Sequence, residues 1–176
     1  MKQPAPTKTG TRDRAILELL YGTGLRLSEC TRLDLPDLSL GGRHLFVRNG
    51  KGRKDRVVPL MGRAAHALTI YLKEVRPSLS KTLRESAVFL SRDGNRISTN
   101  QVQTRLALYG QGAGLKMKLR PHLLRHTCAT HLLAGGASIR HVQSLLGHRS
   151  LRTTEIYTRV EIGDLRQVLL RAHPRK

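Results

Sequence analysis

The chain has 176 residues, a length that fits one compact domain with a hydrophobic core of its own. It carries 32 Lys and Arg against 12 Asp and Glu, a formal net charge of +20. Because the self-repulsion of so many cations calls for an anionic partner, nucleic acid is the leading candidate. Heparin-binding proteins share this composition. No stretch approaches the roughly 20 apolar residues that span a bilayer, and residues 1–10 lack the apolar core of a secretory signal, so we expect no membrane partner and a cytoplasmic, DNA-associated location.

The N-terminal segment predicts a tail followed by a helix. Residues 1–10 are rich in Pro, Thr, Lys and Gly and read as a flexible tail or linker, which leaves residues 11–176 as one domain. Thr11 is a candidate N-cap for a helix with one apolar face, and Gly22 and Gly24 mark its end.

Two charged residues follow that predicted helix end. Arg26 lies just past it, and a second short helix is predicted to begin at Ser28. Glu29 then falls in the first turn, where a carboxylate interacts favourably with the helix dipole. We expect Glu29 to orient Arg26 or a histidine rather than to react, and a plain carboxylate at a helix start is the alternative.

A hairpin is predicted next. Residues 44–48 and 56–60 are β-prone runs, and residues 49–55 between them are rich in Gly and Lys. This pattern puts Lys51 near the hairpin tip.

Further along, residues 62–75 have helical periodicity and residues 87–90 predict a short strand before a turn at residues 93–95. Ser98 followed by Gln101 has capping-box spacing and opens another helix. The predicted fold class is therefore α+β, mainly α-helical, with a small antiparallel β-sheet.

A helix over residues 121–134 is predicted from Pro121 in its first turn and two glycines after its end. His122 and Arg125 are three residues apart, so they share a helix face.

Ser138 is a candidate cap for the next helix, and Gly147 supplies its exit. Its predicted apolar stripe consists of Ile139, Val142, Leu145 and Leu146. His148 then lies at a helix C-terminus, and Tyr157 on the segment that follows.

The order and spacing of these residues carry more information than any one of them. Arg26 precedes Lys51 by 25 residues, Arg125 precedes His148 by 23, and Tyr157 follows that histidine by 9. The pattern resembles the catalytic set of tyrosine recombinases, the phage integrase and Xer family.

The resemblance extends over residues 12–171 and includes the phrases at residues 20–29 and 125–133. It implies the tyrosine recombinase catalytic-domain fold. Members of that family commonly carry a separate DNA-clamping domain ahead of this one, so the chain is expected to be either an excised fragment or a minimal recombinase.

The residue types suit phosphodiester cleavage without a metal, which needs a nucleophile, an acid for the leaving group and fixed positive charge around the phosphorus. Arginine stays protonated and matches two phosphate oxygens with its planar fork. A lysine can protonate the leaving oxygen, and histidines can accept the tyrosine proton or bind a phosphate oxygen. The predicted catalytic residues are Arg26, Lys51, His122, Arg125, His148 and Tyr157.

The resemblance implies the course of the reaction as well. A tyrosine attacks the scissile phosphate to give a 3′-phosphotyrosyl link and a free 5′-hydroxyl, and a hydroxyl of the partner strand then attacks that link. The covalent intermediate conserves bond energy, so no metal, ATP or other cofactor is expected. The implied partners are double-stranded DNA and further protomers in a tetrameric synapse.

Basic residues beside the hairpin are candidates for contacts with DNA phosphates, although a solvated turn is nearly as good an interpretation. They are Arg53, Lys54 and Arg56. Lys54 also lies three residues from Lys51, and either lysine can approach the leaving group.

A metal site is not expected, because His122, His126 and Cys128 do not reproduce a zinc-ligand spacing and carboxylates are scarce. Cys30 and Cys128 fall within helical patterns and are expected to be reduced, packed thiols.

Two other functions share features of this pattern. A type IB topoisomerase uses the same chemistry, and a DNA-binding protein without catalysis would have the same charge. The phrases at residues 124–127 and 146–150 look more like an integrase than a topoisomerase, and the six filled catalytic positions disfavour a protein without catalysis.

Residues 160–176 predict a terminal helix with an apolar stripe. The stripe consists of Ile162, Leu165, Val168, Leu169 and Ala172. The family resemblance implies docking into a neighbouring protomer, our preferred interpretation, and folding back onto the chain's own core is the alternative.

Overall fold

The computed structural model describes residues 4–48, 55–82, 84–147 and 159–174, with the backbone alone for 159–163. The elements in chain order are α1 (Lys8–Thr23), α2 (Leu27–Arg32), the 3₁₀ turn η1 (Leu35–Asp37), β1 (Leu38–Ser39), β2 (His44–Val47), β3 (Arg56–Pro59), α3 (Gly62–Ile70), the π-helical turn η2 (Tyr71–Val75), α4 (Arg76–Leu79), α5 (Thr99–Gly112), α6 (Pro121–Ala134), α7 (Ile139–Leu146) and α8 (Arg159–Ala172). The predicted class, mainly α-helical with a small antiparallel sheet, is confirmed.

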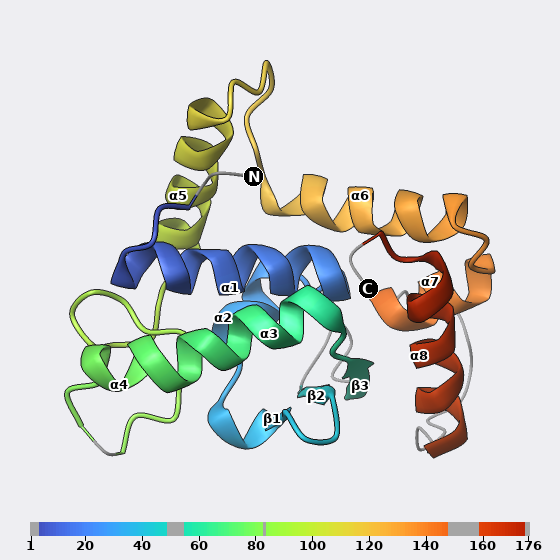
Figure 1. Cartoon of the computed structure of the whole chain (residues 1–176), viewed down its shortest axis with the longest axis horizontal. Helices are drawn as coiled ribbons and strands as arrows, with labels where there is room; N and C mark the ends of the chain where they lie inside the picture. The colour runs from blue at the N-terminus through green and yellow to red at the C-terminus, as the bar shows by residue number, and fades with distance from the viewer. Residues whose placement is uncertain (1–3, 49–54, 83, 148–158, 175–176) are drawn as a thin grey trace.

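Helix α1 is the central element, with α3 packed on one side and α6 on the other (Figure 1). It begins earlier than predicted, because Thr7 rather than Thr11 is the N-cap: the Thr7 hydroxyl accepts from the N–H of Gly10 at 3.1 Å. The N–H of Thr11 already bonds the carbonyl of Thr7 at 2.7 Å, as within a helix. The expected boundary between tail and domain at residue 10 therefore falls inside α1.

The end of α1 agrees with the prediction. Gly24 has φ +64°, a left-handed conformation that glycine adopts without strain, and its N–H bonds the carbonyl of Leu20 at 3.0 Å. Helix α2 starts at Leu27, one residue before the predicted start, with Arg26 as its N-cap residue and Glu29 in its first turn.

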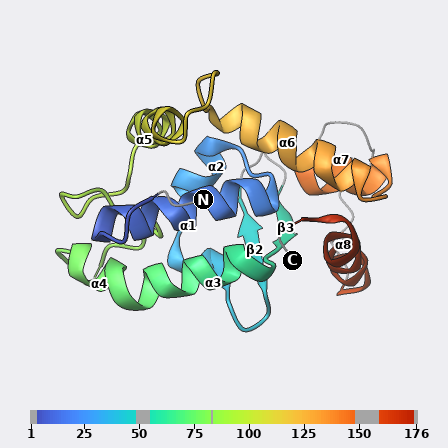
Figure 2. The same ribbon diagram turned by 45° about the horizontal axis from the view of Figure 1, so that its top comes forward.

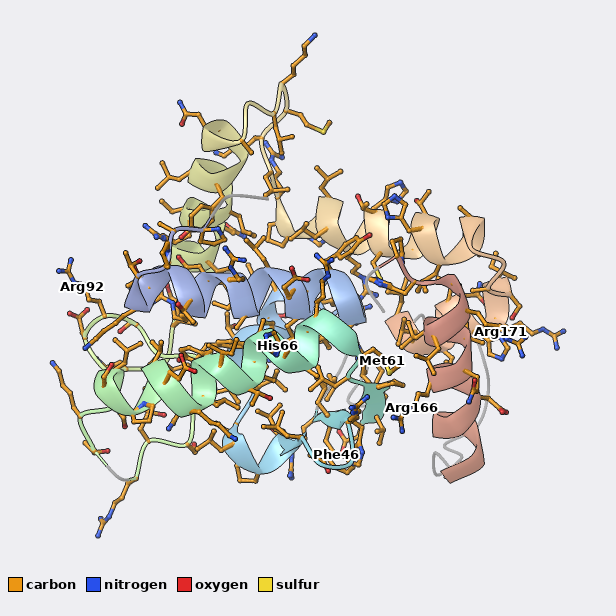
Figure 3. All side chains as sticks on the ribbon, viewed as in Figure 1. Phe46, Met61, His66, Arg92, Arg166 and Arg171 are labelled. Atoms are coloured by element: carbon orange, nitrogen blue, oxygen red, sulfur yellow. The ribbon has the colours of Figure 1, made fainter. Side chains whose placement is uncertain are left out.

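The three strands form one antiparallel sheet in the order β1-β2-β3. The predicted pairing of the two hairpin strands is confirmed, with His44 opposite Pro59 and Val47 opposite Arg56. Leu45 is fully buried, whereas Phe46 is 42% exposed on the opposite face (Figure 3). This alternation is that of a sheet with one face on the core.

The helix predicted over residues 62–75 continues through η2 and α4 to Leu79. Pro77 explains the wider π turn that precedes it, because proline has no N–H and its ring clashes with the carbonyl four residues earlier. The strand predicted over residues 87–90 is replaced by two isolated bridges, Asp34 with Ala87 and Leu90 with Arg96.

Helix α5 starts with the predicted capping box. The Ser98 hydroxyl accepts from the N–H of Gln101 at 3.2 Å, and the Gln101 side chain accepts from the N–H of Ser98 at 2.9 Å. Figure 2 shows α5 at the edge of the molecule, next to the start of α6.

A buried carboxylate fastens α5 to α1. One oxygen of Asp13 accepts from the Nε and Nη2 of Arg12 at 2.8 and 2.6 Å. The other accepts from the Nε of Arg105 and the hydroxyl of Tyr109, both at 2.7 Å. The Nη1 of Arg12 also bonds the carbonyl of Leu90 at 2.9 Å. We refer to Arg12, Asp13, Arg105 and Tyr109 as the Asp13 cluster.

Helix α6 has the predicted bounds, residues 121–134, with Pro121 in its first turn. Ser138 caps α7 by accepting from the N–H of His141 at 3.3 Å, and Gly147 ends it with φ +64°, both as predicted. One residue of the predicted α7 stripe is wrong: Ile139 is 62% exposed, because α7 is covered only from its second turn onwards, where Val142 is 5% exposed.

Helix α8 packs against α6, α7 and β3 of its own chain. Leu165 and Leu169 are 4% and 2% exposed, and Arg166 projects towards the sheet while Arg171 projects outward (Figure 3). The end of the helix lies so close to Gly135 that a Cβ there would stand 2.3 Å from the carbonyl oxygen of Ala172. The described arrangement is the fold-back alternative, whereas docking into another protomer stays a prediction.

Cys30 and Cys128 are free and buried in the common core, as predicted. Among the described residues, no helix combines the length and apolar character needed to cross a membrane.

Candidate active site

The end of α7 gathers three arginines from distant parts of the chain. The carbonyls of residues 145–147 each accept from a different one: the first from Arg56 Nε at 3.3 Å, the second from Arg125 Nη2 at 2.6 Å and the third from Arg26 Nη2 at 3.5 Å. The last carbonyls of a helix lack intrahelical partners and lie at the negative end of its dipole. They are therefore natural acceptors for guanidinium groups.

Glu29 joins two of these arginines. Its Oε1 accepts from Arg56 Nη1 and Arg26 Nη1, both at 2.9 Å. Its Oε2 accepts from Arg56 Nη2 and from the backbone N–H of Arg26, both at 2.8 Å. The carboxylate is 9% exposed and has four charge-assisted or backbone partners, so its plane is fixed. The expected contact between Glu29 and Arg26 is present.

Arg125 is held by backbone carbonyls. Its Nη1 donates to the carbonyl of Gly24 at 2.5 Å, its Nη2 donates to the carbonyl of Leu146, and the residue is 9% exposed. A Cβ at position 24 would stand 2.5 Å from a methyl carbon of Leu146, so glycine permits this close approach of α1 to α7.

The four charged residues, Arg26, Glu29, Arg56 and Arg125, form what we call the arginine cluster. Burial alone would raise the pKa of the Glu29 carboxyl, but the hydrogen bonds and charge of Arg56, with those of Arg26, lower it to about 2. Burial and the neighbouring positive charges lower the pKa of Arg125 to about 10, which leaves it a cation at neutral pH. Three cations against one carboxylate leave the cluster with a surplus of positive charge that an anion would compensate.

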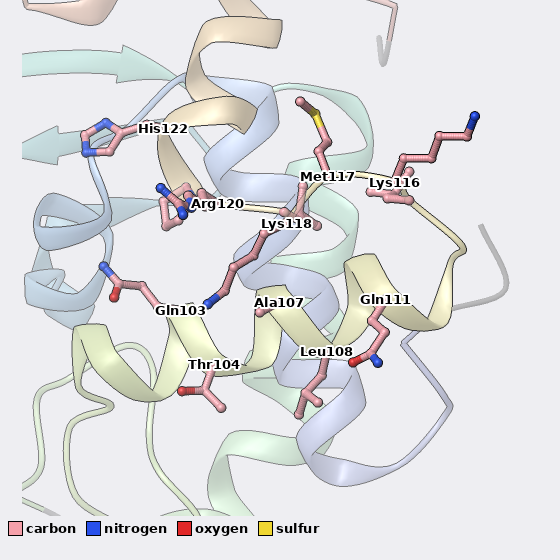
Figure 4. Close-up of a pocket in the computed structure, with 13 residues that line it drawn as sticks. Gln103, Thr104, Ala107, Leu108, Gln111, Lys116, Met117, Lys118, Arg120 and His122 are labelled. Atoms are coloured by element: carbon pink, nitrogen blue, oxygen red, sulfur yellow. The ribbon is translucent and has the colours of Figure 1, made fainter.

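His122 lies one turn before Arg125 on α6 but in a different environment. Its side chain is exposed and lines an open groove of about 840 Å³ formed with α5 and residues 115–121 (Figure 4). The Arg125 side chain is buried against the ends of α1 and α7. The structure brings Arg26 and Arg125 together, whereas the side chain of His122 is exposed in that groove.

The remaining predicted side chains lie outside the described residues. They are Lys51, Arg53, Lys54, His148 and Tyr157. Within the described ranges, no group of three or more His, Cys, Asp and Glu side chains could hold a metal ion.

Arg56 is placed differently from the expected phosphate contact. It is 6% exposed, and its guanidinium donates to Glu29 and to a carbonyl of α7. A signal in the sequence could have shown this, because residues two apart in a strand share a face. Arg56 and Val58 are both buried, whereas Val57 between them is half-buried.

Comparison with known families and proteins places the chain among recombinases. The model of the phage integrase family matches residues 1–162. Tyrosine recombinase XerD of Mycobacterium tuberculosis (strain H37Rv) is 46% identical over 174 residues, which cover 98% of this chain and 56% of that protein. The chain thus spans about half the length of the curated relatives that it matches.

Solved structures give the same grouping. The crystal structure of XerA recombinase matches 96% of this chain and 60% of its own with a TM-score of 0.74 and 36% identity. The XerH site-specific recombinase bound to difH substrate, a pre-cleavage complex, matches 94% of this chain and 48% of its own with a TM-score of 0.72 and 28% identity. The chain therefore shares the tyrosine recombinase catalytic-domain fold.

Proposed function

The chain belongs to the phage integrase family, and we propose that it cuts and rejoins DNA in site-specific recombination through a 3′-phosphotyrosyl intermediate on Tyr157. One observation carries the proposal: Arg26 and Arg125, which are 99 residues apart in sequence, both donate to the end of α7 in a cluster with surplus positive charge. Two fixed guanidinium groups at one place are what a phosphodiester in the transition state requires.

The arginines are the fixed charges in this scheme. A phosphate under attack carries more negative charge than in its ground state, and donors that are already oriented stabilise that charge without reorganising. Backbone carbonyls and Glu29 hold Arg26 and Arg125 before any substrate arrives. Removing a donor of this kind costs on the order of 10²- to 10³-fold in rate.

Proton transfer is assigned to the other predicted residues. Tyr157 has an ordinary side-chain pKa of about 10, so neighbouring cations and a base promote its attack at neutral pH. His122 and His148 accept its proton or bind a non-bridging oxygen, and Lys51 protonates the departing 5′-oxygen.

The partners follow from the chemistry. Each cleavage leaves an enzyme-bound 3′-phosphate and a free 5′-hydroxyl, and a hydroxyl from a second strand restores the phosphodiester. The bond energy stays in the covalent link, so the cycle uses neither ATP nor a metal ion. Exchange between two duplexes uses four protomers, each with one tyrosine. Among similar structures, XerH is bound to its difH substrate, and DNA is likewise the substrate proposed for this chain.

The decisive experiment is trapping of the covalent intermediate. A duplex selected by this chain from a random-sequence pool is nicked so that the 5′-hydroxyl fragment diffuses away after cleavage. The wild-type chain should accumulate a denaturation-resistant adduct with the 3′-phosphate, and Tyr157→Phe should bind the duplex with similar affinity and form none. Full adduct formation by Tyr157→Phe would contradict the assignment.

The role of Lys51 has its own test. Lys51→Ala should slow cleavage strongly on an ordinary phosphodiester, and a 5′-bridging phosphorothiolate should restore the rate because sulfur leaves without protonation. Lys54→Ala is the matched control, since it removes the same charge three residues away. Rescue of Lys54→Ala instead would move the role to that residue.

Metal independence is checked in the same assay. Adduct formation should be unchanged by excess EDTA. Loss of cleavage in EDTA with recovery on adding magnesium would contradict the proposed chemistry.

A further inference from the structure

Arg56 connects three parts of the candidate site. It is the first residue of β3 and pairs in register with Val47 of β2, so it belongs to the hairpin whose connecting segment contains Lys51. Its guanidinium reaches Glu29 on α2 through two bonds and the carbonyl of Leu145 on α7 through a third. A single side chain thus ties the hairpin to the helix start beside Arg26 and to the end of α7.

The contacts of Arg56 also determine where Arg26 stands. Each oxygen of Glu29 accepts one bond from Arg56 and one from Arg26. Because the bidentate pair with Arg56 fixes the plane of the carboxylate, the same plane presents two acceptors to Arg26 at set positions. Without Arg56, the carboxylate could rotate and Arg26 would follow it.

The burial of Arg56 argues against a direct contact with the substrate. The side chain is 5% exposed, whereas the side chain of Arg26 is 23% exposed. The backbone of Gly147 lies close to the guanidinium of Arg56, because a Cβ at position 147 would stand 3.2 Å from it.

We propose that Arg56 is a positioning residue that sets the distance between Arg26 and Arg125 and couples both to the paired strands β2 and β3. Arg56 and Arg125 bond adjacent carbonyls, those of Leu145 and Leu146. The end of α7 therefore fixes the positions of both side chains relative to each other. This inference rests on the proposed function for its consequence in cleavage. Its structural part, the control of Glu29 and Arg26 by Arg56, does not depend on DNA.

Arg56→Met and Arg56→Lys test the proposal in the trapping assay on the nicked duplex. Arg56→Met should slow adduct formation about 100-fold per folded molecule, the scale of a displaced catalytic group, with duplex affinity within about threefold of wild type. Arg56→Lys keeps the charge but loses the planar fork, so it should be slower by about tenfold. An unchanged cleavage rate for Arg56→Met would overturn the proposal.

The salt dependence of duplex binding separates positioning from a direct phosphate contact. A lost phosphate contact reduces the slope of log affinity against log salt by about 1. Arg56→Met should leave the slope unchanged. A reduction of about 1, together with weakened binding, would show that Arg56 touches DNA and would overturn the proposal.

Arg12→Met is the matched control for a loss of stability alone. Arg12 is also buried, with two bonds to a carboxylate and one to a backbone carbonyl, but it belongs to the Asp13 cluster. Both variants should lower the melting temperature, and only Arg56→Met should lower the cleavage rate of the folded fraction. Equal losses of cleavage would make the role of Arg56 merely structural.

A measurement without DNA separates this proposal from the proposed function. Carbon-13 NMR of the Glu29 carboxyl should show its pKa rising in Arg56→Met, and the guanidinium protons of Arg26 should exchange faster with solvent. Unchanged values would overturn the positioning role even if wild type cleaves DNA. If they change while wild type forms no adduct, the proposed function fails and the positioning of Arg26 stands.

Discussion

The Asp13 cluster and the arginine cluster are both built on a buried carboxylate bonded by arginines, but they differ in how much of their positive charge is buried. Each has a buried carboxylate with four hydrogen bonds, and each joins segments far apart in the sequence. In the Asp13 cluster, Arg12 is buried with its carboxylate, and Arg105, whose side chain is 38% exposed, reaches solvent. In the arginine cluster, Arg56 bonds Glu29, whereas Arg125, which is also buried, bonds the carbonyls of Gly24 and Leu146.

The two clusters differ in their charge balance. A buried carboxylate and one buried arginine neutralise each other, which leaves the Asp13 cluster with no demand for a further ion. A second buried guanidinium that hydrogen-bonds only backbone carbonyls among the described residues, as at Arg125, has a lowered pKa because of burial and neighbouring arginines, and an incoming anion would stabilise it. Surplus buried charge therefore indicates a binding site better than the presence of a salt bridge does.

Replacing Arg125 should have the largest effect on cleavage. Arg125→Met should slow adduct formation by about 10³-fold, because it removes an oriented cation at the phosphate. Its free energy of unfolding should fall by only about 2 kcal/mol, because the carbonyls of Gly24 and Leu146 lose a donor while the cost of burying a guanidinium disappears. Single-turnover cleavage and urea denaturation measure the two quantities. A large loss of stability together with a normal cleavage rate would show that Arg125 serves the fold and not cleavage.

Replacing Asp13 should show the opposite pattern. Asp13→Asn should lower the free energy of unfolding by about 4 kcal/mol, because the buried Arg12 loses its counter-charge. Cleavage per folded molecule should stay within about threefold of wild type. Urea denaturation and the trapping assay, both at a temperature where the variant is folded, check this result. A cleavage loss as large as that of Arg125→Met would assign the Asp13 cluster to the active site.

Acid should weaken the arginine cluster at a defined pH. The pKa of Glu29 is lowered to about 2 in the folded chain, so its ionised form stabilises the fold at pH values above its ordinary pKa. This contribution, about 3 kcal/mol from a shift of that size, is lost as the pH falls from about 4.5 towards about 2. The difference in unfolding free energy between wild type and Glu29→Gln should shrink over that interval. A constant difference would mean that Glu29 is not held ionised by its arginines.

A methyl group at Gly147 should have the smallest effect and should separate backbone strain from side-chain contact. Gly147→Ala should cost about 1 kcal/mol, because φ is +64° there, and should also slow cleavage severalfold by pressing on Arg56. Gly136→Ala is the control, since φ is +86° and nothing lies within 4 Å of a Cβ. It should lose similar stability and no cleavage. Equal cleavage rates in both variants would show that a methyl group at Gly147 does not affect cleavage through Arg56.

Local signals in the sequence predicted the secondary structure well. Pro121, Ser98 with Gln101, Ser138 and Gly147 act on their own helix ends, and each has the predicted role. Such signals succeed because the groups that satisfy a helix end lie within a few residues of it. The prediction of Thr11 as an N-cap was wrong, because Thr7, one turn earlier, offers an equivalent hydroxyl and caps the helix.

The sequence pattern did not predict contacts between residues far apart in the chain. Asp13 meets Arg105 and Tyr109, which are 92 and 96 residues away, and no spacing rule relates positions so distant. Arg56 was interpreted as a surface cation because arginine is mostly exposed in proteins, and only the arrival of Glu29 from α2 makes its burial tolerable.

The sequence by itself determined the family, the fold class and the identity of Arg26 and Arg125 as candidate phosphate ligands, because spacing and residue chemistry are properties of the chain. Only the tertiary structure decided which arginine meets solvent and which is held inside, and which elements α8 contacts, namely α6, α7 and β3. Burial depends on which surfaces meet, and the end of α7 gathers side chains that the sequence keeps up to 99 residues apart. Within the described residues, the carbonyls at that helix end and the carboxylate of Glu29 hold Arg56 and Arg125 inside and leave Arg26 partly exposed.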